Sequence, residues 1–245
     1  MILSPRLKFI LTTLLCAWIF NLFAQDNKKP LYAFLIADDL GLGDLSSYYH
    51  KYQTPNLDKI GQDGIKFTNY YSASPICSPS RAGLLTGQQP AKLHFTTFLN
   101  TREDNRRKNQ VDYLDPQVQT MAKVLKSNGY KTAHFGKWHL GGGRDVNDAP
   151  NFDQYGFDSW SGTYESPDPD PAITATDWIW SDQDSIKRWN RTRYFVDKAL
   201  NFLKENKDAL SMYGPMMCIL LGLQETISLV NIPENQMKRK VFKMS

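Results

Sequence analysis

The chain of 245 residues contains few cysteines and histidines, three and four respectively. Cys16 lies in an apolar N-terminal stretch, so the rest of the chain holds only Cys77 and Cys218, too few for a small scaffold built on disulfides. Neither sign of charge dominates, because 29 basic and 25 acidic residues leave a formal net charge of +4. The densest basic run, residues 102–108, is interrupted by acidic side chains, and we expect no nucleic-acid partner.

The apolar content of 41%, with 13% aromatic residues, is sufficient for a sizeable core, and the length predicts one or two domains. Arg6 and Lys8 precede an apolar run at 9–23, which is shorter than the ~20 residues of a membrane span and ends before Ala24 and a polar segment. This pattern predicts a signal peptide at 1–24 and export to the periplasm or the extracellular space. An uncleaved membrane anchor is the alternative.

Strand-like and helix-like segments alternate along the chain, which predicts an α/β sheet with helices on its faces. We expect strands at 31–37, 65–71 and 130–135 and helices at 54–64, 115–129 and 193–206. In the second helix Asp115 is the expected N-cap and Gly129 the C-terminal residue. Residues 145–185 lack periodicity and are interpreted as a long loop region, of the kind that forms substrate pockets beside a rigid sheet.

Two carboxylates, Asp38 and Asp39, follow the apolar strand at 31–37 directly. Ligand sites of α/β sheets lie at the carboxyl ends of strands, and Gly41 and Gly43 allow the turn that would bring both side chains to one cation. Oxygen ligands favour Ca²⁺ or Mg²⁺. An aspartate pair that only caps a loop is the alternative.

Cys77 precedes Ser78 and Pro79, the expected cap and first turn of a helix. The free N–H groups of a helix N-terminus favour an anion, and Arg81, one turn further on, adds a fixed positive charge. The segment therefore predicts an anion site beside a reactive thiolate. A buried structural cysteine is the alternative.

Three segments in this order resemble the motifs of formylglycine-dependent sulfatases. They are Asp-Asp-Leu-Gly at 38–41, Cys-Ser-Pro-Ser-Arg at 77–81 with Leu-Thr-Gly at 85–87, and Gly-Tyr-Lys-Thr at 129–132 with Gly-Lys-Trp-His-Leu-Gly at 136–141. The resemblance implies an alkaline phosphatase-like sulfatase N-terminal domain, with a central mixed β-sheet flanked by helices and incomplete at the C-terminus. It implies hydrolysis of sulfuric esters, and it runs from about Leu31 to about Lys207.

The resemblance implies that Cys77 is oxidised to formylglycine by a formylglycine-generating or anaerobic sulfatase-maturating enzyme. The hydrated aldehyde would be the nucleophile of a covalent mechanism. Asp38, Asp39 and the modified Cys77 would bind the cation, Ca²⁺ with Mg²⁺ as the alternative.

Arg81 and Lys137 would stabilise the hydrate and the developing negative charge, and His139 would transfer protons. If the backbone from Lys137 to His139 is extended, the two side chains share one face. Taken singly, they would be interpreted as a surface lysine and a loop histidine.

The resemblance stops near residue 207, and residues 208–245 contain no Pro-His-Thr-Pro-like segment, no later Asp-Asn or Asp-His pair and no second site lysine. Back-translated and read from third codon positions, residues 212–222 permit Val-Trp-Pro-Asp-Asp-Val-His-Thr-Pro-Trp, which resembles the missing segment. We therefore predict a partial catalytic domain at 25–207 and a frameshifted tail at 208–245, which should be disordered or badly packed. A divergent C-terminus is the alternative.

The substrate class stays open among sulfated polysaccharides and small aryl sulfates. Trp160, Trp178, Trp180 and Trp189 suit stacking on sugar rings, although local packing is the usual role of such residues. A phosphonate or phosphate monoester hydrolase of the same superfamily and a catalytically inactive remnant are the other two hypotheses.

Overall fold

The computed structural model describes residues 30–48, 52–163, 165–173, 184–187 and 190–206, together with the backbone of 216–221 and 242–244. The predicted signal peptide and Trp178, Trp180 and Trp189 lie outside these residues. Within them, the structure contains no helix with the length and hydropathy of a membrane span.

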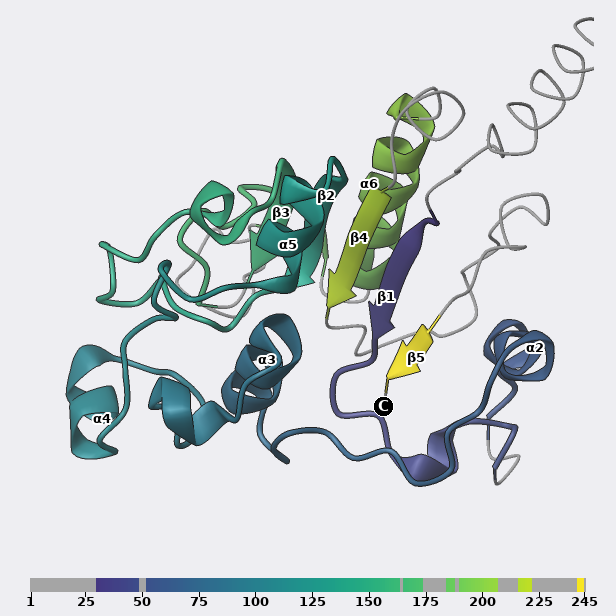
Figure 1. Ribbon diagram of the computed structural model, residues 1–245, viewed down its shortest axis with the longest axis horizontal. Coiled ribbons are helices and arrows are strands. Elements are labelled where there is room, and N and C mark those ends of the chain that lie inside the picture. The colour runs from purple at the N-terminus through teal and green to yellow at the C-terminus, as the bar shows by residue number, and fades with distance from the viewer. Residues whose placement is uncertain are drawn as a thin grey trace, which may run out of the picture.

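The described strands form one sheet in the order β3-β2-β4-β1-β5 (Figure 1). Their bounds are β1 Tyr32–Ile36, β2 Lys131–Lys137, β3 Ser159–Thr163, β4 Met216–Leu221 and β5 Phe242–Met244. Every ladder between them is parallel, so the antiparallel strand that a mixed sheet requires is not among the described residues. The predicted α/β class is confirmed.

Helices cover both faces of the sheet (Figure 1). The α-helices are α2 Pro55–Asp63, α3 Cys77–Thr86, α4 Arg102–Arg107, α5 Met121–Ser127 and α6 Arg191–Glu205. Short 3₁₀ helices span Leu42–Asp44, Pro90–Leu93 and Phe152–Tyr155. The last helix, α6, lies close to the predicted range 193–206, and its buried residues recur at the helical spacing that the sequence shows.

The alternation of side chains along β1 divides the core into two clusters. Tyr32, Phe34 and Ile36 pack against the cluster that contains α3 and α5 residues, while Leu31 and Leu35 pack against the cluster under α6. Successive side chains of a strand point to opposite faces, so one short apolar run serves both layers. This arrangement holds the carboxyl end of β1 firmly between the layers.

The strand predicted at 65–71 is wrong, because this segment has no regular structure and is solvent-exposed. Ile65 and Tyr71 are 75% and 82% exposed. Its aromatic composition favours a strand, but a strand also needs a hydrogen-bonding partner. Both edges of β1 are occupied, by β4 and β5.

The helix predicted from Asp115 begins later, at Met121, with Thr120 as its N-cap. The Asp115 carboxylate instead accepts a hydrogen bond from the Gln117 N–H, a local turn that competes with helix formation. Gly129 has the left-handed backbone that the sequence predicts, with φ of +80°.

The long loop predicted at 145–185 is also partly wrong, since it contains β3 and the 3₁₀ helix Phe152–Tyr155. The β3 sequence, Ser-Trp-Ser-Gly-Thr, has neither strict alternation nor β-branched enrichment to signal a strand. Pairing with β2 determines it, from Ala133 opposite Ser159 to Lys137 opposite Thr163.

Two segments of the predicted tail, β4 and β5, have strand backbone, so the expected disorder does not extend to them. The expectation of bad packing stays a prediction. The backbone of β4 lies between β1 and β2, with Met217 opposite both Tyr32 and Thr132. A buried parallel strand requires only an apolar run of strand length, and Met-Met-Cys-Ile-Leu-Leu provides one. Backbone pairing does not distinguish the two reading frames, so the frameshift stays a prediction.

Candidate active site

Asp38 and Asp39 lie just beyond the carboxyl end of β1, where the chain turns. The turn is made by Asp39 itself, whose φ is +57°, and not by Gly41, whose φ of −77° is ordinary. The Gly41 N–H donates to the Asp44 carboxylate over 2.8 Å, which closes the following 3₁₀ turn. Aspartate is among the residues that tolerate left-handed backbone, and here this conformation keeps two carboxylates together at the sheet edge.

Cys77 is the first residue of α3, as the sequence predicts, but the cap differs. Ile76 is the N-cap, and the Ser78 hydroxyl is turned inward, where it accepts a hydrogen bond from the Leu99 N–H over 3.0 Å. The Cys77 thiol is free and half-buried. It therefore lies where the N–H groups of α3 favour an anionic group.

A single cavity of about 560 Å³ joins the two segments. Its lining includes Asp38, Asp39, Cys77 and Arg81, and residues 70–76 form another part of its wall. The structure thus brings together the first two predicted motifs, which are separated by nearly forty residues of chain, at one open site. A cleft outside the carboxyl ends of parallel strands is the usual ligand position in α/β proteins.

Asp38 joins the first two motifs to the third through ion pairs. Arg81 Nη2 lies 2.8 Å from Asp38 Oδ1, and Lys137 Nζ lies 2.7 Å from Asp38 Oδ2. Arg81 Nη1 also donates to the Lys137 carbonyl over 2.7 Å. Burial alone would raise the pKa of Asp38, but the charges and hydrogen bonds of Arg81 and Lys137 outweigh it and hold that pKa below 3.8.

This ion-pair cluster excludes the simpler interpretations of its members. The Lys137 side chain is only 10% exposed, so it is not a surface lysine, and Asp38 pairs with cations and does not cap a loop. Arg81 puts a fixed positive charge at the wall of the open cavity, and Lys137 adds a second one on Asp38, which also lines the cavity. Such charges favour an anionic ligand.

His139 lies two residues beyond the end of β2, but the premise that placed it on the face of Lys137 is wrong. The Trp138 N–H donates to the Thr163 carbonyl over 2.8 Å, and His139 then adopts left-handed backbone with φ of +55°. The imidazole is 5% exposed, and burial followed by the charges of Lys137 and Arg81 lowers its pKa to about 3. His139 is therefore neutral at pH 7 and electrostatically coupled to both cations.

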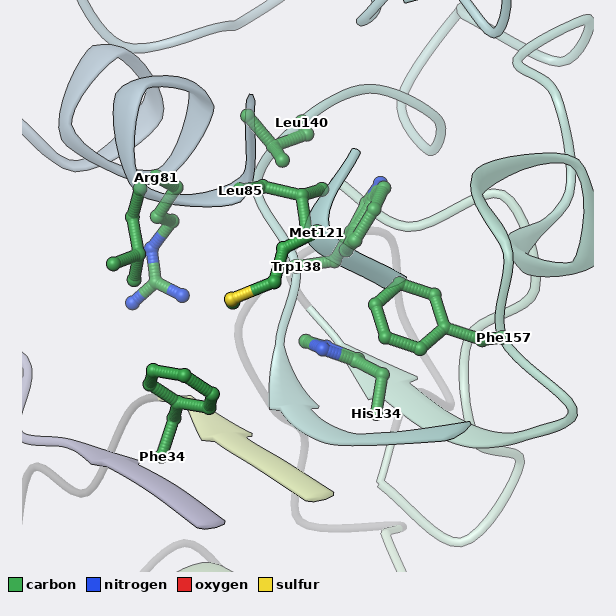
Figure 2. A pocket seen from close by; sticks show the side chains of 9 residues that line it. Phe34, Arg81, Leu85, Met121, His134, Trp138, Leu140 and Phe157 are labelled. Carbon is green, nitrogen blue, oxygen red and sulfur yellow. The ribbon is translucent and has the colours of Figure 1, made fainter. Parts of the chain in front are cut away.

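A second buried histidine, His134, lies beneath Arg81 (Figure 2). Its ring stacks on Phe152 at 5.3 Å between centroids and meets Trp138 edge-on at 5.2 Å. Figure 2 shows His134, Trp138 and Phe157 on one side of a small apolar cavity, with Arg81 and Phe34 on the other. Burial, and then the Arg81 charge, lowers the pKa of His134 to about 3. Sequence reasoning missed this residue, although it lies between the two parts of the third motif.

The donor set of the described residues fits a hard cation in part. Asp38 and Asp39 present carboxylate oxygens to the same cavity, and Asp38 stays ionised because its pKa is lowered. A carboxylate offers about four lone-pair positions, so the two ion pairs leave Asp38 capacity for a cation. Among the described residues no cluster of three or more metal-binding side chains occurs, whereas Ca²⁺ takes about six to eight oxygens.

Sequence reasoning also missed Glu165, which is 3% exposed. Its Oε2 lies 3.5 Å from Nε2 of His139. No local signal marks it, since it follows β3 in a polar, proline-containing stretch. Only the pairing of β3 with β2 brings it to the end of the third motif.

Comparison with known proteins agrees with this geometry. The Sulfatase family model matches residues 30–216. N-acetylgalactosamine-6-O-sulfatase of Bacteroides thetaiotaomicron is 41% identical over 141 residues, which is 55% of this chain and 26% of that protein. Human N-acetylgalactosamine-6-sulfatase is 39% identical over 140 residues, 56% of this chain and 26% of that protein.

A solved structure from work on the metabolism of multiple glycosaminoglycans by Bacteroides thetaiotaomicron has the same fold, with a TM-score of 0.62 and 26% sequence identity. The match covers 84% of this chain and 52% of that chain. The alignments thus span about a quarter of the two curated relatives and about half of the solved structure. With a family model that covers most of its length and motif residues gathered at one cavity, the chain belongs to the sulfatase family.

Proposed function

We propose that the protein is a sulfuric ester hydrolase that uses a formylglycine derived from Cys77 as its nucleophile. The observation that carries the proposal is the shared cavity, in which Cys77 faces two carboxylates and the buried Arg81. A nucleophile at a helix N-terminus, a cation site and fixed positive charges are the three elements that attack on an anionic ester requires.

Asp38 and Asp39 would hold the cation, Ca²⁺ in preference to Mg²⁺, together with residues beyond those described. When bound, the cation would supply Lewis-acid polarisation of the sulfate group. The ion pairs of Asp38 keep its carboxylate ionised and oriented before any ligand arrives.

Arg81 and Lys137 would bind the sulfate oxygens and stabilise the negative charge that grows on them. Both are pre-positioned, because Arg81 is anchored on the Lys137 carbonyl and both are fixed to Asp38. Pre-positioned donors in a water-poor site do not need to reorganise during the reaction, which is the main source of their catalytic value. Neutral His139 would accept and return the protons.

The two relatives named above are N-acetylgalactosamine-6-sulfatases, and we propose a sulfated glycan or an aryl sulfate as the substrate here. The half-buried Trp160 is not a free stacking platform, since it packs on Phe152 and donates to Asp168 over 2.6 Å. Export by the residue 1–24 signal peptide and maturation by a formylglycine-generating or anaerobic sulfatase-maturating enzyme belong to the same proposal.

The experiment co-expresses the full chain with a maturation enzyme and measures two things. Mass spectrometry of the Cys77 peptide should show the thiol replaced by an aldehyde. Turnover of an aryl sulfate should exceed turnover of the matching aryl phosphate, and Cys77→Ala should abolish it. Preference for the phosphate would favour a phosphate or phosphonate monoester hydrolase. A fully converted chain that hydrolyses neither ester would be an inactive remnant.

A further inference from the structure

The backbone beyond the ends of β2 and β3 is held together unusually closely. The strands remain paired as far as Lys137 opposite Thr163. His139 and Glu165 lie two residues beyond the ends of β2 and β3. Both are non-glycine residues with positive φ, +55° and +40°. Such conformations persist only where the surroundings enforce them, and they concentrate at functional sites.

The packing at Gly142 restricts the backbone near His139 and Glu165. A Cβ atom at this glycine would lie 2.4 Å from the Pro167 nitrogen and 2.5 Å from the Ser166 carbonyl carbon. The segment after Glu165 therefore packs directly on the backbone that follows His139. The two side chains have little freedom to move apart.

Two acceptors lie beside His139 Nε2. The Leu99 carbonyl oxygen lies at 3.3 Å and Glu165 Oε2 at 3.5 Å. Burial raises the pKa of Glu165 above 4.5, although the hydrogen bond and charge of Arg144 oppose the rise. The ion pair with Arg144 marks Glu165 as the carboxylate. A carbonyl and a carboxylate can only accept, so Nε2 carries the hydrogen and Nδ1 carries the basic lone pair.

We propose that Glu165 is a positioning residue for His139, which it holds, together with the Leu99 carbonyl, in the Nε2–H tautomer so that Nδ1 is the base. The proposal deepens the proposed hydrolase function and rests on it for its kinetic consequence. The Leu99 peptide also links His139 to the nucleophile segment, since its N–H donates to Ser78, the neighbour of Cys77. Acceptors placed beside one ring nitrogen set the tautomer of catalytic histidines.

Arg144 fixes which oxygen of Glu165 faces His139, and this allows a direct test. Its guanidinium donates to Glu165 Oε1, so the other oxygen faces His139. In Glu165→Gln the carbonyl oxygen must stay on Arg144, which has no acceptor, and the amide NH₂ must then face His139 Nε2. A donor at that position favours the opposite, Nδ1–H tautomer. In Glu165→Ala the Leu99 carbonyl still selects the Nε2–H tautomer.

The isosteric variant should therefore be the more damaging one. We expect Glu165→Gln to lower the kcat of sulfate ester hydrolysis by about tenfold to about a hundredfold with little change in KM, and Glu165→Ala to lower it less. A merely structural role predicts the reverse order, because glutamine preserves packing and alanine leaves a cavity. Asp168→Asn is the matched control, an exposed carboxylate three residues away that bonds to Trp160.

A spectroscopic measurement on the full chain separates this proposal from the proposed function. In ¹⁵N NMR at neutral pH, His139, identified by the signals lost in His139→Asn, should show a protonated Nε2 and a bare Nδ1. Glu165→Gln should shift the populations toward Nδ1–H, and Asp168→Asn should not. An unchanged tautomer in Glu165→Gln, or a protonated Nδ1 in the unaltered protein, would overturn the proposal whether or not the chain turns over any ester.

Discussion

The buried histidines should make the free energy of unfolding depend steeply on pH. Burial first, and then nearby positive charge, lowers the pKa of His134 and of His139 from 6.5 to about 3. Below pH 6.5 the unfolded chain therefore binds more protons than the folded protein. The stabilisation is complete above the unfolded pKa and is lost progressively as the pH falls from 6.5 toward 3.

The size of the effect follows from these two values. Each imidazole has a pKa of 6.5 in the unfolded chain and about 3 in the folded protein. A change from about pH 7 to about pH 5 therefore lowers the free energy of unfolding by about 2 kcal/mol for each histidine, and by about 4 kcal/mol for His134 and His139 together. The lowered pKa of Asp38 adds stability that is lost only as the pH falls below 3.8, outside this window.

Urea unfolding at about pH 7 and about pH 5 measures the difference. We expect His134→Phe, which fills the aromatic site without a titrating nitrogen, to lose about 2 kcal/mol less than the unaltered protein over this interval. His94→Asn is the control, because His94 is exposed and its left-handed φ of +57° is one that asparagine accepts. If the free energy of unfolding of His134→Phe depends on pH as strongly as that of the unaltered protein, His134 is not a source of the pH dependence.

Three further predictions concern stability and are checked by urea or thermal unfolding. Phe152→Ala should cost about 3 to 5 kcal/mol, because Phe152 is fully buried and contacts the rings of His134 and Trp138. Thr132→Val should cost about 1 to 2 kcal/mol, since the buried Thr132 hydroxyl donates to the Gly156 carbonyl over 2.6 Å. Gly142→Ala should cost at least about 2 kcal/mol through its positive φ of +97° and the backbone that a methyl group would meet.

Local rules were sufficient where a segment carries its own signal. The apolar run of β1 ending in Asp38 and Asp39, the start of α3 at Cys77 and the periodicity of α6 all appear in the structure within a few residues of the prediction. Each of these three elements depends on residues that are close in sequence or on one continuous apolar face. The end of β1 and the start of α3 also line the cavity.

Local rules failed where partners come from distant parts of the chain. Residues 65–71 have strand composition but no ladder, and β3 has a ladder but little strand composition. Glu165 reaches His139 only because β2 and β3 pair in a register that the sequence does not display. The tautomer of the proposed base thus depends on sheet pairing and not on the motif that contains the histidine.

The reading frame of residues 208–245 can be separated from the fold by experiment. Main-chain ladder bonds between β4 and its neighbours require an extended backbone of about six residues and do not specify the side chains, so the same place in the sheet is compatible with either frame. We expect resequencing of codons 205–225 to yield Val-Trp-Pro-Asp-Asp-Val-His-Thr-Pro-Trp. If independent DNA reproduces the printed frame, the frameshift prediction is wrong. Further carboxylate ligands of the proposed cation would then have to come from elsewhere, because Asp38 and Asp39 are the only carboxylates among the described residues that line the cavity beside Cys77.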